Sequence, residues 1–215
     1  QLKKKGFSKR ESTEKIAEDL NVQSILKKSS VNWDGGYTIV GMLGHGDSFV
    51  MRDPSGIRPA FYYQDEEVVV ATSERPAIQT VFNVPVEKIK ELKPGYALII
   101  KKNGKTGEFL FREPMEKKSC SFERIYFSRG TDKDIYNERK KLGKLLSPEI
   151  LKEIDYDLEN TVFSYIPNTA AVAFRGLAEE LEKFCNTIKK DKILQLGNKI
   201  TPQKLDKIFQ IMPRI

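Results

Sequence analysis

The residues best placed to do chemistry, or to order a turn, lie between Arg52 and Pro59 in the sequence Arg-Asp-Pro-Ser-Gly-Ile-Arg-Pro. Two guanidinium groups and a carboxylate stand beside two prolines, which fix φ, and a glycine, which can adopt the positive φ of a tight bend. Arg52, Asp53 and Arg58 could therefore hold a domain contact or shape a channel. We favour a structural turn ordered by an arginine–aspartate pair, because such pairs commonly serve geometry alone.

A second candidate is the pair Asn168-Thr169, which follows a predicted strand over 161–167 and precedes a predicted helix over 170–184. Backbone N–H groups and a hydroxyl at the start of a helix suit an anion such as phosphate. The same hydroxyl also suits a simple N-cap. Both interpretations stay open.

The single histidine and the two cysteines carry little chemical signal. His45 lies between two glycines in a predicted hairpin turn, with no second base or nucleophile near it in sequence, so we interpret it as a turn residue. Cys120 and Cys185 are far apart and have no neighbouring histidine or cysteine, which favours free thiols in a reducing compartment.

Composition limits the class of protein. Of the 215 residues, 39% are hydrophobic and 31% charged, as in a soluble globular protein. No apolar run approaches the roughly 20 residues that cross a bilayer, so we expect a cytoplasmic protein with no membrane partner. The net charge of +7 is spread over scattered lysine pairs without a recognised nucleic-acid module. We therefore expect no nucleic-acid partner, and a basic nucleic-acid-binding module is the least favoured alternative.

Periodicity divides the chain into two parts. The N-terminal part is mostly antiparallel sheet with some helix, and the C-terminal part alternates helix and strand. An amphipathic helix is predicted over 12–28, with Ser12 or Thr13 as its cap, and a short helix over 75–82. Short β-branched and aromatic runs predict strands over 37–43, 48–51, 60–63, 68–72 and 97–100. After a polar connector, a basic helix over 135–146 precedes the strand and helix named above, an order typical of a parallel α/β domain.

Six segments in order along the chain resemble the amidophosphoribosyltransferase family, from about residue 33 to residue 180. They are 36–41, 52–59, 73–75, 93–97, 122–129 and 166–170. The resemblance implies an α+β chain: an incomplete αββα sandwich of the N-terminal-nucleophile hydrolases over 1–114, an interdomain segment over 115–134, and the start of an α/β phosphoribosyltransferase domain over 135–215. The segment 122–129 resembles this family rather than other glutamine amidotransferases.

The same resemblance implies a function in purine biosynthesis. Such enzymes free ammonia from glutamine and add it to C1 of phosphoribosyl pyrophosphate, giving phosphoribosylamine. It implies substrate binding by Asn168 and Thr169, with the Thr169 hydroxyl helping to hold the accompanying Mg²⁺. Tyr126 and Phe127 could line the ammonia path between the two sites, although core packing on a half-buried strand is the favoured interpretation.

The chain also departs from the family pattern. The family nucleophile is a cysteine at the mature N-terminus, where this chain has Gln1, and no phosphoribosyl loop follows Thr169. We therefore expect a central fragment without activity of its own; the alternative is a non-catalytic scaffold or regulatory relative. Cys120 matches an iron–sulfur ligand of some members, but a cluster takes four thiolates, so none is expected. We expect a homo-oligomer, because missing front strands would expose a sheet edge or apolar face.

Overall fold

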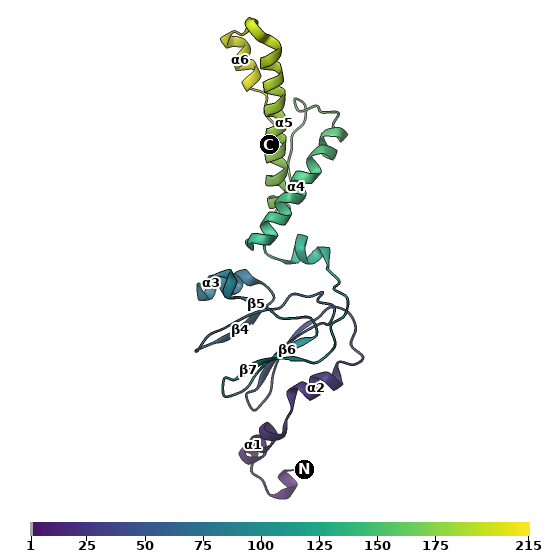
Figure 1. The fold of residues 1–215 in the computed structure, drawn as a ribbon, viewed down its shortest axis with the longest axis vertical. Helices are drawn as coiled ribbons and strands as arrows, with labels where there is room; N and C mark the ends of the chain where they lie inside the picture. Colours follow the sequence, from purple (N-terminus) through teal and green to yellow (C-terminus); the bar gives the residue numbers. More distant parts are fainter. Residues whose placement is uncertain (1) are drawn as a thin grey trace. The chain divides into compact units, whose positions relative to one another are not determined.

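The computed structural model describes residues 2–215, which form two compact units that meet in sequence between Ser121 and Phe122 (Figure 1). The first unit contains all the strands of the described chain, and the second is helical. The chain is thus α+β with two antiparallel sheets. Among the described residues, none of the helices combines the length and apolar composition that crossing a bilayer requires.

Two antiparallel sheets form the centre of the first unit. Sheet A has the order β1-β2-β6-β7, and sheet B has the order β4-β3-β5. The strands of sheet A are β1 (Thr38–Met42), β2 (Ser48–Arg52), β6 (Tyr96–Ile100) and β7 (Thr106–Leu110). The strands of sheet B are β3 (Phe61–Gln64), β4 (Val69–Thr72) and β5 (Lys90–Glu91).

Successive residues of a strand point to opposite faces of the sheet, so each face of sheet A packs against a different layer. Helix α2 (Val22–Ser29) packs on one face of sheet A around Met51, Ala97 and Ile99. The other face of sheet A meets sheet B around buried side chains that include Val50, Leu98 and Tyr62.

The outer face of sheet B is covered by helix α3 (Arg75–Phe82). Tyr63 of β3 lies 6.3 Å from the ring of Phe82, and Arg75 lies over the ring of Phe61 at 5.6 Å. The layers therefore follow the order helix, sheet, sheet, helix.

The sequence predicts one continuous helix over 12–28, and this prediction is wrong, because the structure has two helices there. The structure has α1 (Lys9–Asp19), capped reciprocally by Ser8 and Glu11, and then α2, whose N-cap Asn21 accepts a hydrogen bond from the Ser24 N–H. The first helix ends at Asp19 because its C-cap Leu20 is extended, and the Asn21 side chain then caps the start of the second helix. The five predicted strands and the helix over 75–82 are confirmed within a residue or two, whereas β5 and β7 were not predicted.

The second unit is built on α4 (Lys133–Glu153), α5 (Ala171–Leu196) and α6 (Pro202–Phe209). Its core includes Leu151, Phe163, Leu177, Leu181 and Cys185. Short helical turns complete the described chain, at Lys3–Lys5, Val86–Lys88, Glu123–Phe127 and Gly197–Lys199.

The predicted strand over 161–167 is wrong. Val162 forms only an isolated parallel bridge with Arg214, in which the Phe163 N–H donates to the Arg214 carbonyl at 2.8 Å, and Ile166 is 86% exposed. A strand needs a neighbour for its backbone groups, and the described part of this unit supplies no sheet. The predicted start of an α/β domain is therefore seen here only as helices.

Helices α4 and α5 approach each other closely at two glycines. A Cβ on Gly143 would lie 1.7 Å from the Ala173 carbonyl oxygen, and one on Gly176 would lie 1.9 Å from that of Lys140. Glu179 contacts Lys140 at 2.5 Å and Lys144 at 3.1 Å beside this crossing. The absence of side chains at the two glycines lets the backbones meet, and the ion pairs flank them.

Candidate functional site

The turn after β2 is organised by the buried guanidinium of Arg52. Its Nε donates to the Arg58 carbonyl at 2.7 Å, its Nη1 to the Leu92 carbonyl at 2.6 Å, and its Nη2 to the Gly56 carbonyl at 3.2 Å. Nη1 also lies 2.8 Å from the carboxylate of Glu91. One side chain thus satisfies three carbonyl groups of two loops, as the rigid fork of arginine allows.

The neighbouring Asp53 is fully buried and closes the same turn from the other side. Its carboxylate accepts the Ile57 N–H at 2.9 Å and the Arg58 N–H at 3.0 Å. Gly56 has φ +62° in this turn, which explains the glycine there. Arg52 thus contacts backbone carbonyls and Glu91, and Asp53 accepts backbone N–H groups, so both residues order the turn mainly through backbone groups.

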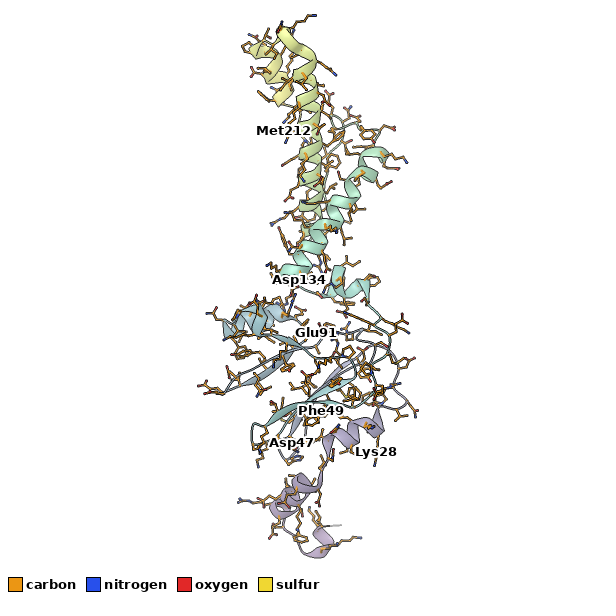
Figure 2. All side chains as sticks on the ribbon, viewed as in Figure 1. Lys28, Asp47, Phe49, Glu91, Asp134 and Met212 are labelled. Carbon is orange, nitrogen blue, oxygen red and sulfur yellow. The ribbon has the colours of Figure 1, made fainter. Side chains whose placement is uncertain are left out.

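A second buried cluster lies at the hairpin between β1 and β2, where Asp47 is labelled in Figure 2. The Asp47 carboxylate accepts hydrogen bonds from the Lys101 ammonium and, at 2.9 Å, from the Lys102 N–H. His45 Nε2 lies 3.2 Å from Asp47 Oδ2. Sequence analysis places His45 in this turn but misses the partners of Asp47, because Lys101 and Lys102 lie more than fifty residues away from it.

The electrostatics of Asp47 favour a structural role. Burial alone would raise the pKa of this carboxyl, but the hydrogen bonds from Lys101 and Lys102, with smaller contributions from His45 and the Lys101 charge, lower the pKa to about 2. A general base works best with a pKa near the operating pH. Asp47 is therefore a poor base and a good anchor for the β6–β7 hairpin.

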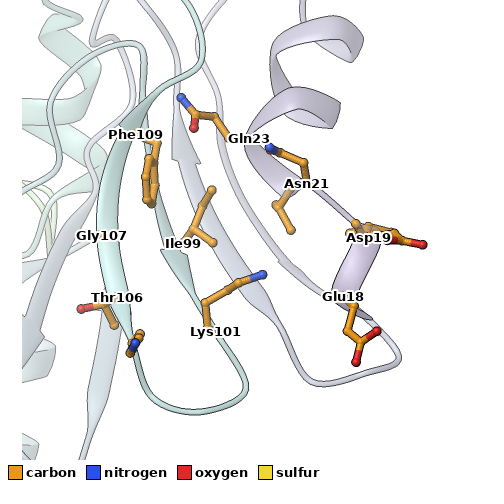
Figure 3. A pocket seen from close by; sticks show the side chains of 12 residues that line it. Glu18, Asp19, Asn21, Gln23, Ile99, Lys101, Thr106, Gly107 and Phe109 are labelled. Atoms are coloured by element: carbon orange, nitrogen blue, oxygen red, sulfur yellow. The ribbon is translucent and has the colours of Figure 1, made fainter. Parts of the chain in front are cut away.

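A groove of about 570 Å³ lies on the α2 side of sheet A, beside the start of that short helix (Figure 3). Ile99 and Phe109 form its apolar floor, Lys101 stands at its rim, and the junction between α1 and α2, from Glu18 to Gln23, forms its far wall. Its volume is in the range of small-molecule sites. Sequence analysis did not predict it, because its two walls belong to segments about eighty residues apart.

Asn168 and Thr169 lie in the turn that precedes α5, and both are exposed. The N-cap position of α5 is Ala170, and no side chain caps it. The predicted N-cap role of Thr169 is therefore wrong in this structure. The predicted phosphate and Mg²⁺ contacts of Asn168 and Thr169 stay predictions.

Tyr126 and Phe127 lie in a helical turn rather than on a strand, with side chains 63% and 52% exposed. Their rings meet edge to face at 5.4 Å. The favoured prediction of core packing is therefore wrong. Arg139 of α4 holds this turn by donating to the Arg124 carbonyl at 3.0 Å and the Ser128 carbonyl at 2.6 Å, and the ammonia path stays a prediction.

The two cysteines are free thiols, one half-buried and one buried. Burial raises the pKa of the Cys185 thiol. Within residues 2–215, no group of three or more histidine, cysteine, aspartate or glutamate side chains is arranged to hold a metal ion. The interpretation of Cys120 and the Mg²⁺ expected in the whole protein stay predictions.

No family model matches the chain, but curated proteins and solved structures do. The amidophosphoribosyltransferases of Lachancea kluyveri and Saccharomyces cerevisiae are each 32% identical to it, over 162 and 158 residues, and that of Bacillus subtilis is 30% identical over 158 residues. These matches cover 69–72% of this chain but 31% of each relative. The chain thus spans about a third of the length of the curated relatives that it matches.

Two solved structures have a similar fold. One is the glutamine phosphoribosylpyrophosphate amidotransferase of B. subtilis complexed with ADP and GMP, with a TM-score of 0.58 over 80% of this chain and 37% of that one. The other is described as the allosteric regulatory enzyme of purine biosynthesis, with a TM-score of 0.61 over 83% of this chain and 39% of that one. Both are 26% identical in sequence.

Proposed function

We propose, from the premise that this chain is a relative of the amidophosphoribosyltransferases, that the whole protein transfers glutamine-derived ammonia to phosphoribosyl pyrophosphate in purine biosynthesis. The reaction consumes glutamine, water and phosphoribosyl pyrophosphate and gives phosphoribosylamine, glutamate and pyrophosphate. The observation that carries this proposal is the 32% identity over more than two-thirds of the chain. The similar fold of the two solved amidotransferase structures supports it.

Each unit then has a place in the whole protein. The helix–sheet–sheet–helix order of the first unit is what part of an N-terminal-nucleophile hydrolase sandwich would contribute, and we assign this unit to the glutamine-hydrolysing domain. We assign the second unit to the phosphoribosyltransferase domain. The Arg52–Asp53 turn is a scaffold element in this proposal, because its polar groups are engaged by the fold.

The proposed contacts with phosphoribosyl pyrophosphate are the Asn168 amide and the Thr169 hydroxyl. Mg²⁺ is proposed only for the whole protein, since magnesium sites use one or two carboxylates with substrate phosphates, and the described residues hold no group of three metal-binding side chains. These two residues therefore do not make a metal site by themselves. Tyr126 and Phe127 are proposed to face the ammonia path, and the 63% and 52% exposure of their side chains supports this.

The experiment compares the whole protein with the 215-residue chain. Pyrophosphate release from phosphoribosyl pyrophosphate is measured with glutamine and, separately, with ammonium chloride as the nitrogen source. We expect both activities in the whole protein and neither in the chain alone, because it lacks the family nucleophile and phosphoribosyl loop. A whole protein that releases no pyrophosphate with either source would favour the non-catalytic scaffold instead.

A variant of the whole protein tests the substrate contact. Thr169→Val should raise the KM for phosphoribosyl pyrophosphate several-fold, because one lost hydrogen bond costs about 1 kcal/mol, and should leave glutamine hydrolysis unchanged. Thr187→Val, at another exposed threonine of the second unit, is the matched control. An unchanged KM in Thr169→Val would remove this residue from the proposed site.

A further inference from the structure

The segment that follows β7 and joins the two units in sequence is fastened at its start to the first unit. We call residues 111–128 the connector. The Arg112 N–H donates to the Gly95 carbonyl at 3.2 Å. The Arg112 guanidinium donates to the Ser30 and Trp33 carbonyls, just after α2, at 3.1 and 2.5 Å. The start of the connector is therefore part of the first unit and moves with it.

Two further hydrogen bonds hold the next residues of the connector to the turn at 52–59. The Met115 N–H donates to the Pro54 carbonyl at 2.8 Å, and the Lys118 N–H donates to the Ser55 carbonyl at 3.0 Å. The side chains that order this turn bind other backbone groups of the first unit, so they do not compete for these two carbonyls. The turn thus presents two acceptors to the connector.

The far end of the connector is fastened to α4 of the second unit. Arg139 of α4 is buried and donates to the carbonyls of Arg124 and Ser128 at 3.0 and 2.6 Å. Arg124 Nε donates to the Glu138 carboxylate at 2.7 Å, and the Ser128 N–H closes the helical turn on the Glu123 carbonyl at 2.9 Å. Because one buried guanidinium bridges two of its carbonyls, this helical turn moves with the second unit.

Three residues between these two fastened segments lack such support. The backbone N–H groups of Ser119, Cys120 and Ser121 donate to no acceptor in the part of the chain that the structure describes. Their side chains are small, and those of Ser119 and Ser121 are exposed. Hinges in proteins are commonly a few loop residues that absorb changes in φ and ψ. The connector is therefore held at both ends and unsupported only in its middle.

We propose that residues 119–121 form a hinge between the two units, and that the turn at 52–59 is the fixed base of this hinge in the first unit. A rigid base confines bending to the residues beyond it, and the buried side chains of Arg52 and Asp53 supply that rigidity. Bending at the hinge breaks none of the hydrogen bonds that hold either end of the connector. This inference concerns the connection itself and does not rest on the proposed function.

The first test measures the NMR relaxation of backbone amide nitrogens in the 215-residue chain. Rigid backbone has order parameters of about 0.85, and flexible backbone has values below about 0.6. We expect Met115, Lys118 and Ser128 near the rigid value and the three hinge residues below the flexible one. Rigid values at all three hinge residues would overturn the hinge, and flexible values at Met115 and Lys118 would overturn its base.

The second test removes one hydrogen bond of the base. Lys118→Pro deletes the N–H that donates to Ser55, so the flexible stretch should extend back to Glu116, with an order parameter there below about 0.6. Lys117→Pro is the matched control, because the Lys117 N–H donates to no acceptor among the described residues, and it should leave Glu116 unchanged. Both variants should keep the amide chemical shifts of sheet A, because these positions are exposed. Equal order parameters at Glu116 in the two variants would overturn the role of the turn as the base of the hinge.

Discussion

The guanidinium of Arg52 on β2 lies 2.8 Å from the carboxylate of Glu91 on β5, and this contact joins the two sheets of the first unit. The partners are unequal, because Arg52 is buried whereas the Glu91 side chain is about half exposed. Arg52 therefore stabilises the fold mainly through its hydrogen bonds to the carbonyls of Arg58, Leu92 and Gly56, and less through the ion pair with Glu91.

That inequality predicts different costs for removing the two partners. Arg52→Ala should lower the free energy of unfolding of the first unit by about 3 kcal/mol or more, since it leaves buried carbonyl groups unpaired. Glu91→Gln should cost less than about 1 kcal/mol, as for a partly exposed ion pair. Urea unfolding followed by the fluorescence of Trp33, the single tryptophan, measures both. Equal costs would show that the ion pair, and not the backbone contacts, carries the stabilisation.

The Asp53 carboxylate should matter more than an identical arrangement at the surface. Asp65 accepts the Glu67 and Val68 N–H groups at 2.9 and 2.8 Å in an exposed hairpin, which makes it a matched control. Asp53→Ala should lower the free energy of unfolding by about 2–4 kcal/mol, because two half-buried N–H groups lose their partner. Asp65→Ala should lower it much less, because water replaces the exposed carboxylate. The same urea titration ranks the two, and a reversed order would contradict the burial argument.

Asp47 should make the stability of the first unit depend on acid pH. Its pKa is about 2 in the folded chain and 3.8 in the unfolded chain, so folding favours the ionised carboxylate. Its contribution, about 2 kcal/mol at most, is fully present above pH 4 and is lost as the pH falls from about 4 to about 2.

The check on this pH effect is the urea midpoint measured between pH 2 and pH 6 for the unchanged chain and for Asp47→Asn. The variant should be less stable at pH 6, and the difference between the two chains should shrink toward pH 2. A difference that stays constant over this range would mean that Asp47 titrates alike in the folded and unfolded states.

The close crossing of α4 and α5 should not tolerate a methyl group. Gly143→Ala should lower the free energy of unfolding of the second unit by about 3 kcal/mol, since overpacking commonly costs 1–3 kcal/mol and the obstructing Ala173 carbonyl belongs to rigid backbone. Gly130→Ala is the control, because its Cβ would meet its nearest neighbours at an ordinary 3.5 Å. Thermal unfolding followed by helical circular dichroism reports on this unit. An unchanged transition in Gly143→Ala would contradict the close contact between the α4 and α5 backbones at this glycine.

Local chemistry in the sequence determined the elements that carry their own signals. The helix over 75–82 is predicted with the bounds of α3, because Pro76 suits a helix start and the pattern ends at Phe82. The strands β1, β2, β3, β4 and β6 follow from short β-branched and aromatic runs, and prolines and glycine mark the turn at 52–59. The family resemblance also comes from the sequence alone, since it rests on the order of short segments.

Tertiary structure decided the features that depend on distant partners. Strand β5 consists of two charged residues and exists only because β3 pairs with it, whereas the apolar segment 161–167 forms no strand because no neighbour is present in the described chain. The role of Asp47 needed Lys101, and that of Arg52 needed Leu92 and Glu91, each far away in sequence. Propensity is a local property, but hydrogen bonds across sheets and buried ion pairs are made only when the fold brings remote segments together.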